Sequence, residues 1–124
     1  CNVGYWLSED DPNKTNVVTD NNEDYRAFML ANIVGSETSL TVSPEFVKSR
    51  KGKATISIEW FSEAGDSWAL YADGQKLGVA TGMETGFITD SFNVEKCPEH
   101  LILRKISGNP KFHIVEVQAN AFRP

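Results

Sequence analysis

The chain has 124 residues, 40% of them hydrophobic and 23% charged, a composition typical of one globular domain. Its net charge is −5, and six of its 17 acidic residues fall within residues 1–25 beside a single base, Lys14. The only basic cluster, in residues 48–53, is interpreted as a solvated loop, so a nucleic-acid-binding protein is excluded. No apolar run approaches the roughly 20 residues of a membrane-spanning helix.

The first element expected is residues 25–33, YRAFMLANI, whose pattern fits both a helix and a strand. Apolar residues at spacings of three and four suit a helix, while Tyr25, Ala27 and Met29 also alternate with their neighbours. No other segment keeps a helical period over several turns. We therefore interpret this segment as a strand as well.

Alternation with a period of two is clearest in residues 53–61, KATISIEWF. Ala54, Ile56, Ile58 and Trp60 would face a core, and the residues between them would face the other way. This segment is predicted to be a strand with one buried face.

Residues 68–72 alternate in the same way, which places Trp68 in the core and Tyr71 on the opposite side. The Asp73–Gly74 pair that follows is preferred in type I′ hairpin turns, so a hairpin returning along residues 76–80 is predicted.

Further strands are predicted at residues 38–42, 86–92, 100–106 and 111–119, separated by Gly and Pro. About eight short strands without internal repeats predict an all-β fold, an antiparallel β-sandwich or jelly roll. We expect residues 1–124 to form this single domain.

The two cysteines are Cys1 and Cys97. No secretory signal precedes Cys1, which suggests a mature or trimmed chain, or one that was never exported. Export leaves two interpretations of Cys1: a disulfide to Cys97, or a lipid-modified N-terminus. We expect the disulfide, which would stabilise the fold by about 4 kcal/mol in the chain-entropy model. Two unrelated thiols are the alternative.

The stretch from Asp20 to Tyr25 holds five acidic or amide side chains in six residues. It is not an EF-hand loop, because Tyr25 and Ala31 occupy the positions that require glycine and the final glutamate. Two interpretations stay open. The stretch caps a helix with Asp20 or Asn22, or it contributes to a calcium loop that needs oxygen ligands from elsewhere in the fold.

Residues 16–22, NVVTDNN, and residues 112–122, FHIVEVQANAF, resemble the two ends of the galactose-binding-like jelly roll. That superfamily includes discoidin domains, F-type lectins and bacterial carbohydrate-binding modules. The resemblance implies a structural calcium ion held by Asp20, Asn22, the carbonyl of Val17 and the side chain of Glu116.

Sugar recognition combines an aromatic ring with a few polar groups. Trp60 and Trp68 are in phase with core residues and are not expected to contact a ligand. The aromatic and cationic side chains expected at the surface, and hence as ligand contacts, are Tyr5, Trp6, Tyr25, Arg26 and Tyr71. Packing of the N-terminal segment is the alternative role for each of them.

Enzyme signatures are absent from the sequence. His100 and His113 lie in predicted strands without a cysteine or histidine at metal-ligand spacing, so structural roles are expected. There is no phosphate loop, nucleophile elbow or dinucleotide fingerprint. We expect no catalytic activity.

The leading hypothesis is a noncatalytic, lectin-like carbohydrate-binding module of an exported or cell-surface protein, with a glycan or glycoprotein as partner. Its location would be extracellular or at the cell surface, and lipid anchoring through Cys1 would be the alternative to the disulfide. The competing hypothesis is a structural or adhesive module that binds protein. An exposed apolar patch would favour the second hypothesis.

Overall fold

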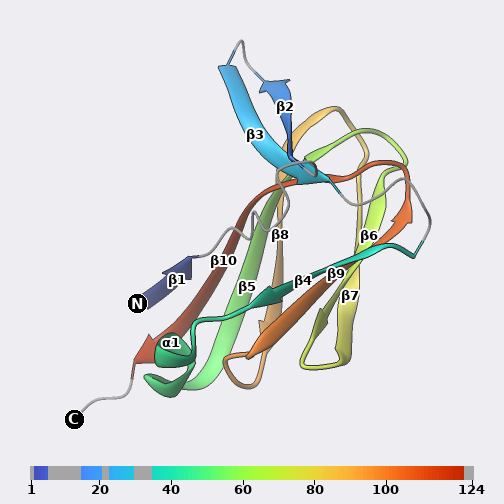
Figure 1. Cartoon of the computed structure of the whole chain (residues 1–124). Coiled ribbons are helices and arrows are strands. Elements are labelled where there is room, and N and C mark those ends of the chain that lie inside the picture. The colour runs from blue at the N-terminus through green and yellow to red at the C-terminus, as the bar shows by residue number, and fades with distance from the viewer. Residues whose placement is uncertain (1, 6–14, 21–22, 30–34, 122–124) are drawn as a thin grey trace.

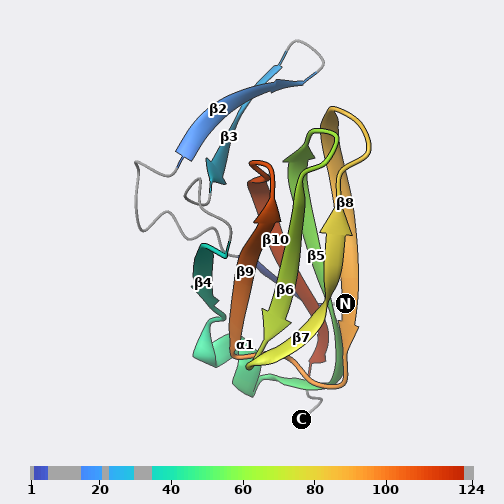
Figure 2. The same cartoon turned by 90° about the vertical axis from the view of Figure 1, so that its right-hand side faces the viewer.

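The computed structural model describes residues 2–5, 15–20, 23–29 and 35–121, and it is a sandwich of two antiparallel sheets (Figure 1). One sheet has six strands in the order β2-β3-β10-β5-β8, with β1 also paired to β10, and the other has the order β4-β9-β6-β7. Figure 2 shows the four strands of the second sheet side by side. The elements are β1 (Asn2–Tyr5), β2 (Thr15–Asp20), β3 (Glu23–Met29), β4 (Glu37–Thr41), α1 (Pro44–Lys48), β5 (Arg50–Ser62), β6 (Ser67–Ala72), β7 (Gln75–Thr81), β8 (Gly86–Val94), β9 (His100–Ser107) and β10 (Lys111–Ala121).

The predicted all-β sandwich is confirmed, with ten strands in the described residues where about eight were expected. The two unexpected strands, β1 and β2, each pair with one neighbour only. β1 pairs with β10, which is distant in sequence, and β2 pairs with β3 in a hairpin. A local alternation pattern reveals neither pairing. The strand predicted at residues 25–33 is confirmed over its described part, within β3.

The alternation predicted for residues 53–61 places the core correctly. Ile56, Ile58 and Trp60 of β5 are fully buried between the sheets. Trp68 of β6 is also fully buried and meets Trp60 edge to face, with ring centroids 5.7 Å apart. Both tryptophans are therefore core residues, as predicted.

The hairpin predicted at Asp73–Gly74 joins β6 to β7. Asp73 and Gly74 have φ angles of 48° and 82°, the positive values that a type I′ turn requires at both central positions. The β6–β7 turn lies at the lower end of the sandwich in Figure 1. Asp73 Oδ1 accepts there from the backbone N–H of Glu99, in the connection between β8 and β9.

The basic cluster is solvated as predicted, since Lys48, Lys51 and Lys53 are exposed, but the prediction of a loop is wrong. Lys48 ends the single-turn helix α1, and residues 50–53 begin β5. Ser43 and Pro44 start the helix, because the Ser43 hydroxyl accepts from the Phe46 N–H at 3.5 Å and proline suits the first turn. The Arg50 guanidinium lies 4.2 Å from the centre of the Phe46 ring, a cation–π contact that orders this basic side chain.

Candidate functional site

The outer side of the six-stranded sheet carries short polar side chains on three neighbouring strands. Buried residues alternate on β5 and β10, so the residues between them point away from the core. The register then sets β8 and β10 residues beside those of β5. We call this surface the polar face, and its members are Thr55, Ser57, Glu59, Thr89, Ser91, Asn93, Glu116 and Gln118.

Hydrogen bonds across β5 and β8 hold the polar face in order. The Thr55 hydroxyl donates to Asn93 Oδ1 at 3.0 Å, and the hydroxyls of Ser57 and Ser91 lie 3.0 Å apart. Each hydroxyl oxygen keeps lone pairs, and the Asn93 amide keeps its N–H donors, after these bonds form. The face is therefore an ordered array of donors and acceptors that is open to solvent.

The polar face ends in a group of rings. A bulge in β10 between Phe112 and Ile114 re-aims His113, whose Nδ1 lies 2.7 Å from Glu59 Oε1. The His113 ring lies 5.2 Å from Phe87, and Phe87 lies 5.3 Å from Phe61 in an edge-to-face contact. Phe87 is half-buried, so part of its ring borders the polar face.

At the other end of the polar face the surface is hollowed. A depression of about 160 Å³ is lined by Lys53, Thr55, Gln118, Ala119 and Asn120. The face thus runs from a ring-lined end to a polar depression, with two carboxylates, Glu59 and Glu116, between them.

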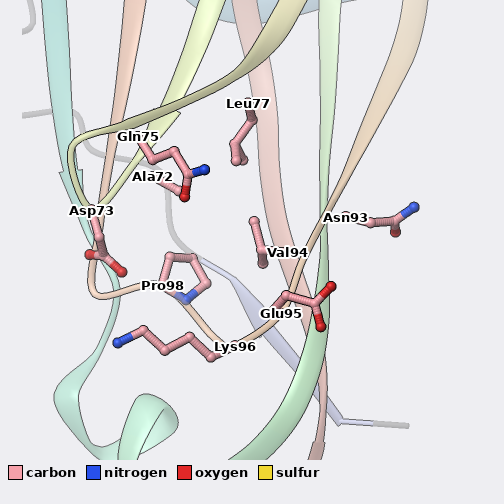
Figure 3. Close-up of a pocket in the computed structure, with 9 residues that line it drawn as sticks. All are labelled: Ala72, Asp73, Gln75, Leu77, Asn93, Val94, Glu95, Lys96 and Pro98. Carbon is pink, nitrogen blue, oxygen red and sulfur yellow. The ribbon is translucent and has the colours of Figure 1, made fainter.

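A second concave region lies at the lower end of the sandwich, between the β6–β7 turn and the end of β8. Figure 3 shows this end pocket, which has a volume of about 510 Å³. Leu77, Val94 and Pro98 form an apolar floor. Asp73, Gln75, Asn93, Glu95 and Lys96 supply its polar rim.

Hydrogen bonds hold one side of the end pocket in place. Asp73 Oδ1 accepts from the backbone N–H groups of Glu99 and His100 at 3.1 and 3.0 Å. Because these bonds tie the β6–β7 turn to the start of β9, the two segments that flank the pocket are fixed to each other.

Cys97 is buried between Lys96 and Pro98, both of which line the end pocket, and its thiol contacts the Pro98 carbonyl at 3.9 Å. Burial raises the pKa of the Cys97 thiol, the nearby Arg50 lowers it and Asp73 raises it. The thiol is therefore protonated near neutral pH. Cys97 is a free thiol in the structure, so the predicted disulfide to Cys1 is not found; Cys1 itself lies outside the described residues.

The residues predicted to bind calcium are distributed over two regions. Val17 and Asp20 belong to the β2–β3 hairpin, where their Cα partners are Arg26 and Glu23. Glu116 lies in the middle of β10, beside Ser57, on the polar face. Figures 1 and 2 both show the hairpin extending beyond the sandwich, away from the middle of β10. Asn22 lies outside the described residues.

The residues predicted to contact a ligand are divided between the two sheets. Tyr5 is the Cα partner of Glu116, so its strand borders the polar face. Tyr25 and Arg26 lie in β3, and Trp6 is outside the described residues. Tyr71 lies on the outer side of the other sheet, opposite Ile102.

The polar face itself was not predicted from the sequence. The outward direction of Thr55, Ser57 and Glu59 was predicted from the alternation of residues 53–61, which was the available signal. Their partners on β8 lie 30 or more residues further along the chain, and only the strand pairing identifies them.

Within the described residues, no helix has the length and apolar character needed to cross a membrane. No three His, Cys, Asp or Glu side chains come together there in a way that could hold a metal ion.

No protein-family model and no curated protein matches this sequence. Solved structures do match it over nearly its whole length. The CBM36-1 domain of a multidomain xylanase from the hindgut metagenome of Trinervitermes trinervoides has a TM-score of 0.59 at 10% identity, with 98% of each chain covered. A family 35 carbohydrate-binding module from Clostridium thermocellum has a TM-score of 0.59 at 13% identity, covering 97% of this chain and 100% of the module.

A third match is the module CBM6cm-2 from Cellvibrio mixtus lichenase 5A, solved in complex with cellotriose. Its TM-score is 0.56 at 13% identity, and 86% of each chain is covered. At such low identity the likeness concerns the fold. The chain has the galactose-binding-like jelly-roll fold that these carbohydrate-binding modules share.

Proposed function

We propose that this protein is a noncatalytic carbohydrate-binding module whose ligand lies on the polar face. The observation that carries the proposal is the ordered row of hydroxyl, amide and carboxylate groups across β8, β5 and β10. Sugar hydroxyls both donate and accept hydrogen bonds, and such a row offers both functions on one surface. The shared fold with three carbohydrate-binding modules supports the same function.

The ring-lined end of the polar face supplies the apolar part of the site. The C–H groups on one side of a sugar ring pack against an aromatic face, and the half-buried Phe87 ring is the candidate. The contacts of Phe87 with Phe61 and His113 hold its ring in place, which reduces the entropy lost on binding.

The open ends of the polar face favour a glycan chain that lies along the strands. Successive outward residues on one strand are about 7 Å apart, so Thr55, Ser57 and Glu59 span about 14 Å. A surface of this length contacts more than one sugar residue. The ligand would therefore be an oligosaccharide or a polysaccharide. We place the module in an exported or cell-surface protein, where the structural polysaccharides of cell walls are met.

A structural calcium ion remains a proposal that rests on the resemblance of the two chain ends. The donors Asp20, Asn22, the Val17 carbonyl and Glu116 are oxygen ligands, which calcium prefers. The described backbone does not gather them at one point, since Glu116 lies on β10 and Asp20 at the end of the β2–β3 hairpin. Glycan binding on the polar face does not depend on this ion.

The function is tested by screening the protein against a glycan array and titrating each bound glycan by calorimetry. Ser91→Arg places a long charged side chain on the polar face, and the matched control Ser39→Arg makes the same change at an exposed strand position of the other sheet. We expect Ser91→Arg to abolish binding and Ser39→Arg to leave it unchanged. Equal binding by both variants would refute the polar-face site, and a folded protein that binds no glycan would refute the function.

A protein-binding module is the second candidate. On the outer side of the four-stranded sheet, Val79 of β7 is 47% exposed and Ile106 of β9 is 38% exposed. Tyr71 of β6 and Ile102 of β9 are half-buried on the same side. Exposed apolar groups of this kind are found at protein interfaces. Failure of the glycan screen, together with capture of a partner that Val79→Asp abolishes, would support this function.

A further inference from the structure

The end pocket is larger than the depression on the polar face and shares only Asn93 with that face. It lies between the turn of the β6–β7 hairpin and the segment that leaves β8, and its volume is about 510 Å³. Figure 3 shows Leu77, Val94 and Pro98 at its centre and Gln75, Asp73 and Lys96 around them.

The lining of the end pocket combines the two kinds of contact that a sugar residue offers. The apolar floor suits the C–H side of a ring, and the rim supplies an amide, an ammonium and a carboxylate for hydroxyl groups. Neither Gln75 nor Lys96 makes a recorded side-chain hydrogen bond or ion pair within the described residues, so both have donors free for a ligand.

The end pocket is preorganised on its Asp73 side. The Asp73 carboxylate is held by two backbone N–H groups, of Glu99 and His100, and Asp73 itself sits in the type I′ turn. A rim group that is already fixed loses little conformational freedom when a ligand arrives. Its oxygens retain lone pairs that can accept from a sugar hydroxyl.

Asn93 connects the end pocket to the polar face. Asn93 lines the pocket, and its Oδ1 accepts a hydrogen bond from the Thr55 hydroxyl on the polar face. Asn93 and Val94 point to opposite sides of β8, as Figure 3 shows, and β8 is the edge strand of its sheet. A glycan on the polar face can therefore pass the edge at Asn93 and reach the pocket directly.

We propose that the end pocket is a second carbohydrate subsite that takes the terminal residue of a glycan whose neighbouring residues lie on the polar face. This inference rests on the proposed function. Pro98 and the segment after β8 wall the pocket, which suits the end of a chain and not its interior. The module would then bind chain ends more tightly than internal segments.

The test compares short glycans, which are rich in ends, with polymers, which are poor in them. The probes are cellohexaose, xylohexaose, laminarihexaose and mannohexaose, each with its parent polysaccharide. The pocket variant is Gln75→Ala combined with Lys96→Ala. The control is Lys76→Ala, an exposed lysine of the same hairpin that pairs with Tyr71 within the four-stranded sheet. All three positions are exposed, and thermal melting checks that each variant folds.

We expect the pocket variant to weaken hexaose binding about tenfold and polymer binding by less than about twofold, while Lys76→Ala changes neither. In two-dimensional amide NMR spectra, a bound hexaose should shift the signals of residues 94–97, and the polymer should not. An unchanged affinity for the hexaose, or an equal loss for hexaose and polymer, would overturn the inference.

The outcomes separate this inference from the proposed function. If Ser91→Arg abolishes binding and the pocket variant has no effect, the polar face stands and the end subsite is refuted. If none of the four glycan families binds to the folded protein, both proposals fail together.

Discussion

The two outer faces of the sandwich differ in chemistry although both cover the same core. On the six-stranded sheet, Thr55 is hydrogen-bonded to Asn93 and Ser57 to Ser91, which gives rows of small polar groups. On the four-stranded sheet, Val79 and Ile106 are exposed beside the charged residue Arg104. Burial of the core accounts for the inward residues of both sheets and places no demand on the outward ones. The difference between the faces therefore points to function.

The largest effect on glycan binding is expected when a bulky side chain is placed on one outer face and then, in a second variant, on the other. Ser91→Arg should weaken glycan binding by at least about 100-fold, because a bulky cation displaces the ligand from the polar face. Ser39→Arg, on the other sheet, should change it by less than about twofold. Calorimetric titration measures both. A loss of binding in Ser39→Arg alone would assign the glycan to the opposite face.

The next effect compares one aromatic side chain from each face. Phe87→Ala should weaken glycan binding about tenfold, because the ring at the end of the polar face is lost. Tyr71→Ala removes the half-buried ring of the four-stranded sheet, which the sequence nominates as a ligand contact. We expect less than a twofold change for Tyr71→Ala. A larger loss of affinity in Tyr71→Ala than in Phe87→Ala would show that Tyr71, the contact predicted from the sequence, is the correct one.

A smaller effect concerns the core that both faces share. The pKa of the Cys97 thiol is raised by burial, so the folded state favours the protonated thiol more than the unfolded state does. This contribution to stability is complete below the unfolded thiol's pKa. It is lost as the pH rises through the pKa of the thiol in the folded protein.

Urea unfolding between pH 7 and 10.5 measures that loss. The free energy of unfolding should fall more steeply with pH in the native protein than in Cys97→Ala, which should itself cost about 1 kcal/mol at pH 7. Glycan binding should be lost only with unfolding, since Cys97 belongs to neither face. Parallel slopes for the two proteins would contradict the assignment.

The smallest effect expected on the polar face is that of calcium. Removing the ion with a chelator should lower the melting temperature by a few degrees if the predicted ligands bind it, and Glu116→Gln should remove that response. In the native protein, removing the ion should change glycan affinity by less than about twofold. A chelator that abolishes glycan binding would show that the ion belongs to the sugar site itself.

Much of the fold could be predicted because its signals are local. Alternation placed Ile56, Ile58 and Trp60 on the buried side of β5, and the Asp73–Gly74 pair defined the β6–β7 hairpin. Helix α1 was not predicted, since a single turn does not establish a period. The bulge at His113 was missed for a related reason, because one extra residue in β10 leaves little trace in the alternation.

The candidate sites were predicted less well because they are built from distant segments. Ser57 meets Ser91 and Glu116 only after β5 has paired with β8 on one side and β10 on the other. The end pocket likewise needs residues of β7, β8 and the β8–β9 connection. Residue types alone gave no reason to group these side chains.

The sequence by itself determined the fold class, the core and the principal turn, since side-chain direction in a strand repeats every two residues whatever its partners are. Tertiary structure alone decided the strand order, and with it which outward residues became neighbours. That order arises from contacts between residues far apart in the chain, whose free energy no local pattern encodes. The polar face and the end pocket, where function is proposed, are both products of that pairing.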